Sequence, residues 1–187
     1  GKSSLAHRLA TISAIDYPSG NAPRFLGQSL NLEVARGLTI YFSGEDSAEI
    51  FNARAEIFDP ESKANRLMMQ RTSFLTDDGV KMKSIGDFLE NLHKLPDVSL
   101  VVIDPARKYL EGDENDSEVV SKFFEAIEEF AIEKQCAMVV VHHLEKKAKP
   151  ENVYDIVDLL RGSQVFIDRP RVVIGLSLIH ISEPTRH

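Results

Sequence analysis

Residues 99–143, SLVVIDPARKYLEGDENDSEVVSKFFEAIEEFAIEKQCAMVVVHH, decide the fold class of this chain. The stretch begins with the uninterrupted apolar run SLVVID, which is typical of a strand buried on both faces. A helix follows as far as Lys134, because Asp116 or Ser117 can cap its start and apolar side chains then recur at helical spacing. The next apolar run, over 137–141, predicts another buried strand. A strand, a helix and a strand in this order indicate a parallel pair.

The same alternation of patterns extends outward over the rest of the chain. Residues 16–24 hold two prolines and a glycine and predict a loop. The other expected elements are helices over 2–15, 47–58 and 84–94, a buried strand over 38–42, a short strand within 66–75, a helical piece over 153–160 and a last strand beginning at 172–175. Alternating helices and apolar strands predict an α/β domain with a mostly parallel sheet.

Length and composition limit the classes of protein to which the chain can belong. The 187 residues suffice for one domain, and 43% hydrophobic content can fill its core. A net charge of −7 argues against coating nucleic acid or an anionic membrane by bulk charge. The single cysteine, Cys136, allows no internal disulfide, which is typical of a reducing compartment such as the cytoplasm. No apolar run approaches the roughly 20 residues that span a bilayer.

The segment Gly1-Lys2-Ser3-Ser4, at the start of the first expected helix, has the residue types of the second half of a phosphate-binding loop. Gly1 lets the backbone approach a phosphate, and the helix N-terminus directs N–H groups at the anion. Lys2 would reach the β- and γ-phosphates, and the Ser3 hydroxyl would complete a Mg²⁺ shell. The earlier glycine and the preceding strand of such a loop are absent, so chance or an expression scar is the alternative interpretation.

Polar residues follow three of the apolar strands. Asp104 ends one strand, where a carboxylate can associate with magnesium, although a turn or capping role is the alternative. Glu45 follows another strand and could accept a proton from attacking water, whereas for Asp46 we favour capping of the next helix. His142 and His143 follow a third strand, and one of them could contact a γ-phosphate; the pair lacks the further ligands of a zinc site. Open α/β sheets bind ligands at the carboxyl ends of their strands, so together these features predict a nucleotide site.

These residues resemble the RecA-like ATPases, in particular the RepA-like subgroup within the RepA/DnaB branch of hexameric replicative helicases and their plasmid and phage relatives. The resemblance runs from the first residue to about Ile174. It is carried by GKSSLAHRLA, TIYFSGEDS, LVVIDPARKYLEGDENDSEVV, MVVVHHLEKK and RGSQVFIDRPRVV. It implies a RecA-like three-layer fold, here missing the strand before the phosphate loop, in a cytoplasmic protein of bacterial, plasmid or phage context.

The resemblance also implies ATP and Mg²⁺ as cofactors and a role for each matching residue. Lys2 and Ser3 match the phosphate-loop lysine and the magnesium-binding hydroxyl, and Asp104 matches the Walker B aspartate. Glu45 matches the glutamate that activates water, and one of the two histidines matches the γ-phosphate sensor.

A further implication is a homo-oligomer, expected to be a hexameric ring. Arg171 lies where the family keeps an arginine finger that enters the neighbouring subunit's site, and Arg161 is the second candidate. Such a finger stabilises charge on the transferred phosphoryl group from across the subunit boundary. The alternative for Arg171 is a solvated arginine at a strand edge.

Single-stranded DNA is the implied partner, because in this family the loops after the Walker B and sensor strands line a central channel. Here these loops are 107–116 and 145–162. Tyr109 could stack on a base, although we favour a core or turn role. The second loop carries a compact basic patch, which could equally be a solvated face: Lys146, Lys147 and Lys149.

The tail departs from the family pattern. LSLIHISEPTR, over 176–186, is similar to an in-frame translation of a sequencing-library adapter. We therefore expect an ATPase core over 1–175, truncated at its front, and a non-native tail over 176–187, so that this fragment by itself would be inactive.

Three other functions stay open at this level. A RecA-like ATPase could load or regulate a partner without unwinding DNA. A catalytically inactive copy could serve as an oligomerisation scaffold, although such a copy need not keep the full set of site residues. A kinase of a small substrate shares the phosphate loop, but we recognise no lid or acceptor-binding element for it.

Overall fold

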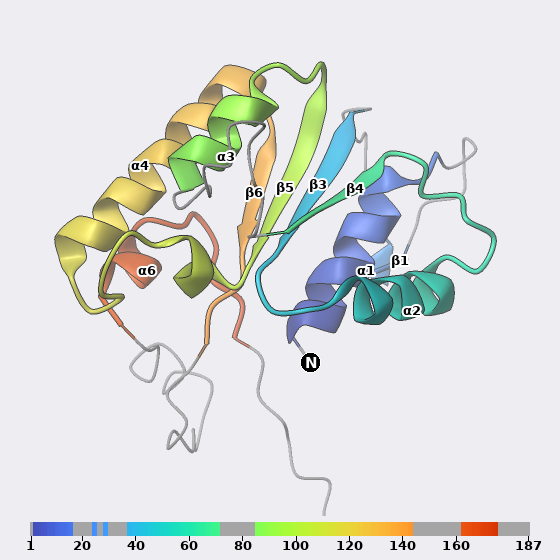
Figure 1. The fold of residues 1–187 in the computed structure, drawn as a ribbon, viewed down its shortest axis with the longest axis horizontal. Coiled ribbons are helices and arrows are strands. Elements are labelled where there is room, and N and C mark those ends of the chain that lie inside the picture. The colour runs from blue at the N-terminus through green and yellow to red at the C-terminus, as the bar shows by residue number, and fades with distance from the viewer. Residues whose placement is uncertain are drawn as a thin grey trace, which may run out of the picture.

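The computed structural model describes residues 2–16, 24–25, 28–29, 37–71, 85–143 and 162–175. In this part of the chain a parallel sheet is sandwiched between helices, as Figure 1 shows. The helices are α1 (Lys2–Ala14), α2 (Ala48–Phe58), α3 (Ile85–Leu92), α4 (Ser117–Lys134) and α6 (Val165–Asp168). The strands are β1 (Arg24–Phe25), β2 (Gln28–Ser29), β3 (Leu38–Ser43), β4 (Leu67–Arg71), β5 (Val98–Asp104) and β6 (Ala137–Val140). The predicted α/β class and parallel sheet are confirmed.

The main sheet has the strand order β4-β3-β5-β6, and every neighbouring pair is parallel. Ser43 at the end of β3 is in register with Asp104 at the end of β5. The carboxyl ends of all four strands therefore lie along one edge. The short strands β1 and β2 form a separate antiparallel pair. Neither strand was predicted from the sequence.

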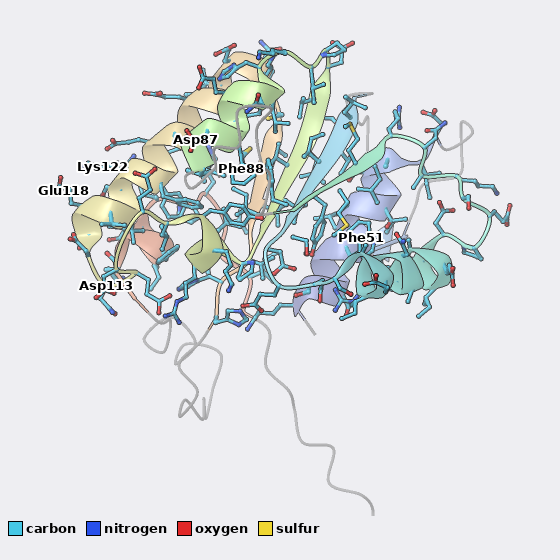
Figure 2. The ribbon with its side chains drawn as sticks, in the orientation of Figure 1. Phe51, Asp87, Phe88, Asp113, Glu118 and Lys122 are labelled. Carbon is cyan, nitrogen blue, oxygen red and sulfur yellow. The ribbon has the colours of Figure 1, made fainter. Side chains whose placement is uncertain are left out.

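Alternation along the strands divides the core into two faces. On β3, Ile40 and Phe42 belong to the apolar cluster that α3 and α4 cover, whereas Tyr41 belongs to the cluster under α1 and α2. Figure 2 shows Phe88 and Phe51, which approach the sheet from opposite sides on α3 and α2. Period-two alternation on strands buried on both faces thus produces the three layers.

The predicted helix ends are set by capping contacts. Asp116 caps α4, since its Oδ1 accepts a hydrogen bond from the Glu118 N–H at 2.8 Å. The helix ends at Gln135, whose φ of 53° lies in the left-handed region. Ser47 caps α2, which ends before the sequence Asp59-Pro60.

Two predictions need correction, and one helix was missed. Residues 172–175 pair with no described strand and lie exposed, so the strand expected to begin there is wrong. The strand β6 is only partly buried rather than fully buried, because among the described strands it pairs with β5 alone. The short helix α6 was not anticipated by the sequence pattern. None of the helices in the described ranges is long and apolar enough to cross a membrane.

Candidate functional site

The carboxyl edge of the sheet brings together the start of α1 and the ends of β3, β5 and β6. The Gly44 N–H donates to the Asp104 carbonyl at 2.7 Å, which joins the chain leaving β3 to the end of β5. The Ala106 N–H donates to the Val141 carbonyl at 2.9 Å, which joins the turn after β5 to the chain leaving β6. This is the edge at which open α/β sheets bind ligands.

Asp104 is the buried centre of this edge, with 5% of its surface exposed. The Tyr41 hydroxyl donates a hydrogen bond to Asp104 Oδ2 at 2.5 Å. Desolvation by burial raises the pKa of Asp104, and hydrogen bonding from Tyr41 and from the nearby Ser3 side chain opposes that rise. The negative charges of Asp46 and Glu45 add to the rise. Asp104 is therefore a buried carboxylate with a side-chain partner on a neighbouring strand.

Ser3 and Lys2 lie in the first turn of α1, both half-buried. The Ser3 side chain lies near the Asp104 carboxyl, so a hydroxyl and a carboxylate are neighbours at a helix N-terminus. Hydroxyl and carboxylate oxygens are the donors that Mg²⁺ prefers, and a helix N-terminus favours anions. The residues present therefore fit a magnesium ion with a bound phosphate. Ser4 lies half-buried in the same turn.

Glu45 and Asp46 have different surroundings. Glu45 is exposed, two residues beyond Ser43 at the end of β3. Asp46 forms an ion pair with Arg54 of α2, through both carboxylate oxygens. The capping role favoured for Asp46 is wrong, because Ser47 caps α2: its Oγ accepts from the Ile50 N–H at 3.4 Å. Only Glu45 of the two is left exposed at the strand end.

The two histidines after β6 are both half-buried. The ring of His142 stacks on Phe166 of α6, with centroids 3.9 Å apart and planes 13° from parallel. The His142 ring is thus fixed by α6. His143 has no ring contact of this kind within the described residues.

Arg171 is exposed, whereas Arg169, two residues earlier, is held on α4. The Arg169 guanidinium contacts Glu128 Oε2 at 2.8 Å and Glu125 Oε1 at 3.2 Å. Of these two arginines, Arg171 is the one that a neighbouring molecule can reach. The remaining predicted features lie outside the described residues: Gly1, Arg161, Lys146, Lys147, Lys149, the helical piece over 153–160 and the tail over 176–187.

The loop after β5 combines basic and buried parts. Arg107 and Lys108 are exposed in a short 3₁₀ turn, and Tyr109 is buried against Phe42 and Phe88, which confirms its core role. Gly44 packs so closely on this turn that a Cβ there would lie 2.7 Å from the Lys108 Cγ.

Sequence reasoning missed two residues at this edge, Tyr41 and Arg54. A tyrosine inside a fully buried strand needs a partner for its hydroxyl, and this signal was available in the sequence. The partner itself, Asp104, is 63 residues away and follows only from the strand register. Burial and the Asp104 charge raise the pKa of Tyr41 well above its ordinary value, so the hydroxyl keeps its proton.

A family model described as an AAA domain matches residues 1–149. The chain belongs to the AAA domain family. This assignment makes it a P-loop ATPase domain with a nucleotide-binding function, in agreement with the edge described above. The matched range holds Lys2, Ser3, Glu45 and Asp104, whereas Arg171 lies beyond it. A search of curated proteins finds no match to this chain.

Proposed function

We propose that the chain is the ATP-hydrolysing motor domain of a RepA-type helicase or translocase that acts on single-stranded DNA. Membership of the AAA domain family supports the ATPase part of this proposal. The observation that carries it is the buried Asp104 carboxylate at the carboxyl edge of a parallel sheet, next to the Ser3 side chain at the start of a helix. A hydroxyl and a carboxylate placed there suit a magnesium-bound triphosphate.

Each residue of the edge has a chemical task in this function. Ser3 and Asp104 would hold a magnesium ion, which would neutralise phosphate charge, and Lys2 would bind the terminal phosphates. Glu45 orients the attacking water and accepts its proton, since the neighbouring Asp46 is already paired with Arg54.

A neighbouring subunit completes the site. Arg171 enters the site of the next molecule and stabilises the charge on the transferred phosphoryl group. Its exposure, in contrast to the two ion pairs of Arg169, supports this assignment. His143 reports the presence of the γ-phosphate, with His142 as the alternative. The assembly that this arrangement requires is a ring, proposed as a hexamer.

The DNA contact is proposed for the two loops that follow β5 and β6. Arg107 and Lys108 supply exposed positive charge in the first loop. A groove that tracks a single strand combines such cations with aromatic groups. The second loop would add the three lysines of its basic patch, Lys146, Lys147 and Lys149.

ATP turnover by the full-length protein tests the chemistry. We expect Glu45→Gln to lower kcat by a factor of about 100 or more while ATP still binds, because the water loses its base. Lys2→Ala should weaken both binding and turnover. Glu56→Gln, an exposed carboxylate of α2, is the matched control and should turn over ATP at the normal rate. Unchanged turnover in both Lys2→Ala and Glu45→Gln contradicts the mechanism.

Strand displacement tests the motor function separately. A labelled strand annealed to a tailed partner should be released only with ATP, and not by the Glu45→Gln protein. ATP turnover that is stimulated by single-stranded DNA without any release of the strand would instead identify a translocase or loader.

A further inference from the structure

Tyr41 is a polar residue at the centre of an apolar layer. It lies in the middle of β3 with no exposed surface, on the face that α1 and α2 cover. Its ring is fixed on two sides, since the His7 centroid is 5.6 Å away and the Phe51 centroid 5.4 Å away. Its hydroxyl reaches the carboxyl edge, 2.5 Å from Asp104 Oδ2 and 3.3 Å from the Ser3 carbonyl oxygen.

The single proton of this hydroxyl has one dominant acceptor. An ionised carboxylate accepts hydrogen bonds and donates none, so Tyr41 must be the donor in its bond to Asp104. The distance to the Ser3 carbonyl is 0.8 Å longer than the distance to Asp104, and a helix carbonyl already accepts a bond within its own helix. The proton therefore belongs to the bond with Asp104.

Asp104 is held from β3 by the Tyr41 hydroxyl, and the Ser3 side chain lies near the same carboxyl in the first turn of α1. A charge-assisted hydrogen bond of this kind fixes the orientation of a carboxylate more firmly than a neutral one does. Without the Tyr41 bond, the carboxylate would lose the side-chain hydrogen bond that it accepts within the described residues.

We propose that Tyr41 is the positioning residue of the magnesium and nucleotide site, an inference that rests on the proposed function. Tyr41 itself would contact neither nucleotide nor metal. It holds the Asp104 carboxylate in place beside the Ser3 side chain. Outer partners of metal ligands act in this way, by orienting the ligand.

The test compares two buried tyrosines in the full-length protein. Tyr41→Phe keeps the ring and removes the hydroxyl that holds Asp104. Tyr109→Phe makes the same chemical change on the opposite face of the sheet, where the buried Tyr109 hydroxyl has no hydrogen-bond partner among the described residues. Both variants keep their ring contacts and are expected to fold.

The first readout is the equilibrium binding of a fluorescent ATP analogue, titrated with Mg²⁺. We expect Tyr41→Phe to raise, by about tenfold, the Mg²⁺ concentration at which the enhancement of ATP-analogue binding is half-maximal. The loss of a residue that orients a metal ligand has an effect of this size. Binding without Mg²⁺ should stay within about twofold, because the phosphate contacts of α1 are intact. Tyr109→Phe should match the wild-type protein in both. A Tyr41→Phe midpoint equal to that of Tyr109→Phe overturns the proposal.

The second readout needs no nucleotide. Hydrogen exchange of the backbone amides in the first two turns of α1 should be faster in Tyr41→Phe than in Tyr109→Phe, because the link from β3 through Asp104 to Ser3 is weakened. Equal exchange in the two variants overturns the positioning role. If the wild-type protein fails to bind the ATP analogue with Mg²⁺, the proposed function fails, and the exchange comparison still decides whether Tyr41 positions Asp104.

Discussion

The two faces of the sheet are built differently. The face under α3 and α4 is packed with aliphatic and aromatic side chains that meet edge to face, such as Phe42, Phe88 and Tyr109. The face under α1 and α2 buries fewer apolar residues and includes polar ones such as His7, Thr11 and Tyr41. The first face stabilises the domain, and the second carries the groups that reach the carboxyl edge. Changes on the two faces should therefore separate stability from activity.

The largest effect is expected for Asp104→Asn. ATP turnover should fall by a factor of about 100 or more, because the carboxylate charge at the proposed magnesium site is lost. The melting temperature should stay equal or rise, since burial of the carboxylate opposes its ionisation. Glu118→Gln, an exposed carboxylate on α4, is the control for turnover. A large loss of stability in Asp104→Asn would remove the distinction between the two faces.

On the opposite face, Phe88→Ala should cost about 3–5 kcal/mol of unfolding free energy, because it leaves a cavity between Phe42 and Tyr109. Chemical denaturation measures this loss. Ile132→Ala removes a side chain that is 77% exposed on α4 and should change stability by less than about 0.5 kcal/mol. A loss below about 1 kcal/mol for Phe88→Ala would show that this face does not stabilise the domain.

His7 gives the α1 face a pH dependence. Burial, with the Arg54 charge adding to it and Asp46 opposing it, lowers the pKa of His7 from 6.5 to about 4. The unfolded chain therefore binds a proton at His7 more readily than the folded protein does. The contribution of neutral His7 to the free energy of unfolding is fully present above pH 6.5 and is lost as the pH falls toward 4.

The expected slope is at most about 1.4 kcal/mol per pH unit, and His7→Leu should flatten it. Denaturation midpoints at a series of pH values measure this slope, and the difference between the two proteins removes the contribution of other groups. Parallel curves for wild type and His7→Leu would contradict the prediction.

The smallest effect is expected for Tyr109→Phe, which should be neutral or more stable by about 0.5 kcal/mol. Its hydroxyl is buried without a partner among the described residues, so its removal loses no hydrogen bond. Tyr41→Phe, which loses the bond to Asp104, should be less stable by about 1 kcal/mol. Denaturation curves of the two variants measure this difference between the faces. Equal stability would show that the Tyr41 hydrogen bond contributes nothing.

The sequence predicted the structure correctly where the local pattern and the long apolar runs indicate the same element. The run ending in Asp104 and the cap at Asp116 were predicted from local rules, and the structure confirms both. The ion pair between Asp46 and Arg54 depends on how α2 lies against the chain leaving β3, so a capping rule gave the wrong role. Period and propensity could not reveal the exposure of residues 172–175, because a strand also needs a partner.

The sequence predicted at which strand ends the candidate site residues lie, but not which of their side chains are in contact. Parallel strands place Ser43 and Asp104 side by side, which a topology argument can foresee. The meeting of Tyr41 with Asp104 depends on register across 63 residues and on which face each side chain takes. A buried tyrosine indicated that a partner exists, but only the fold identifies it.

At Gly44, the chain that leaves β3 packs directly against the turn that follows β5. The chain that presents Glu45 lies directly on the turn that carries Arg107 and Lys108, with no room for even a methyl group between them. A side chain larger than hydrogen at Gly44 would therefore have to displace the Lys108 side chain or the backbone beside Glu45. The methyl group of a Gly44→Ala variant would push the chain after β3 and the turn after β5 apart.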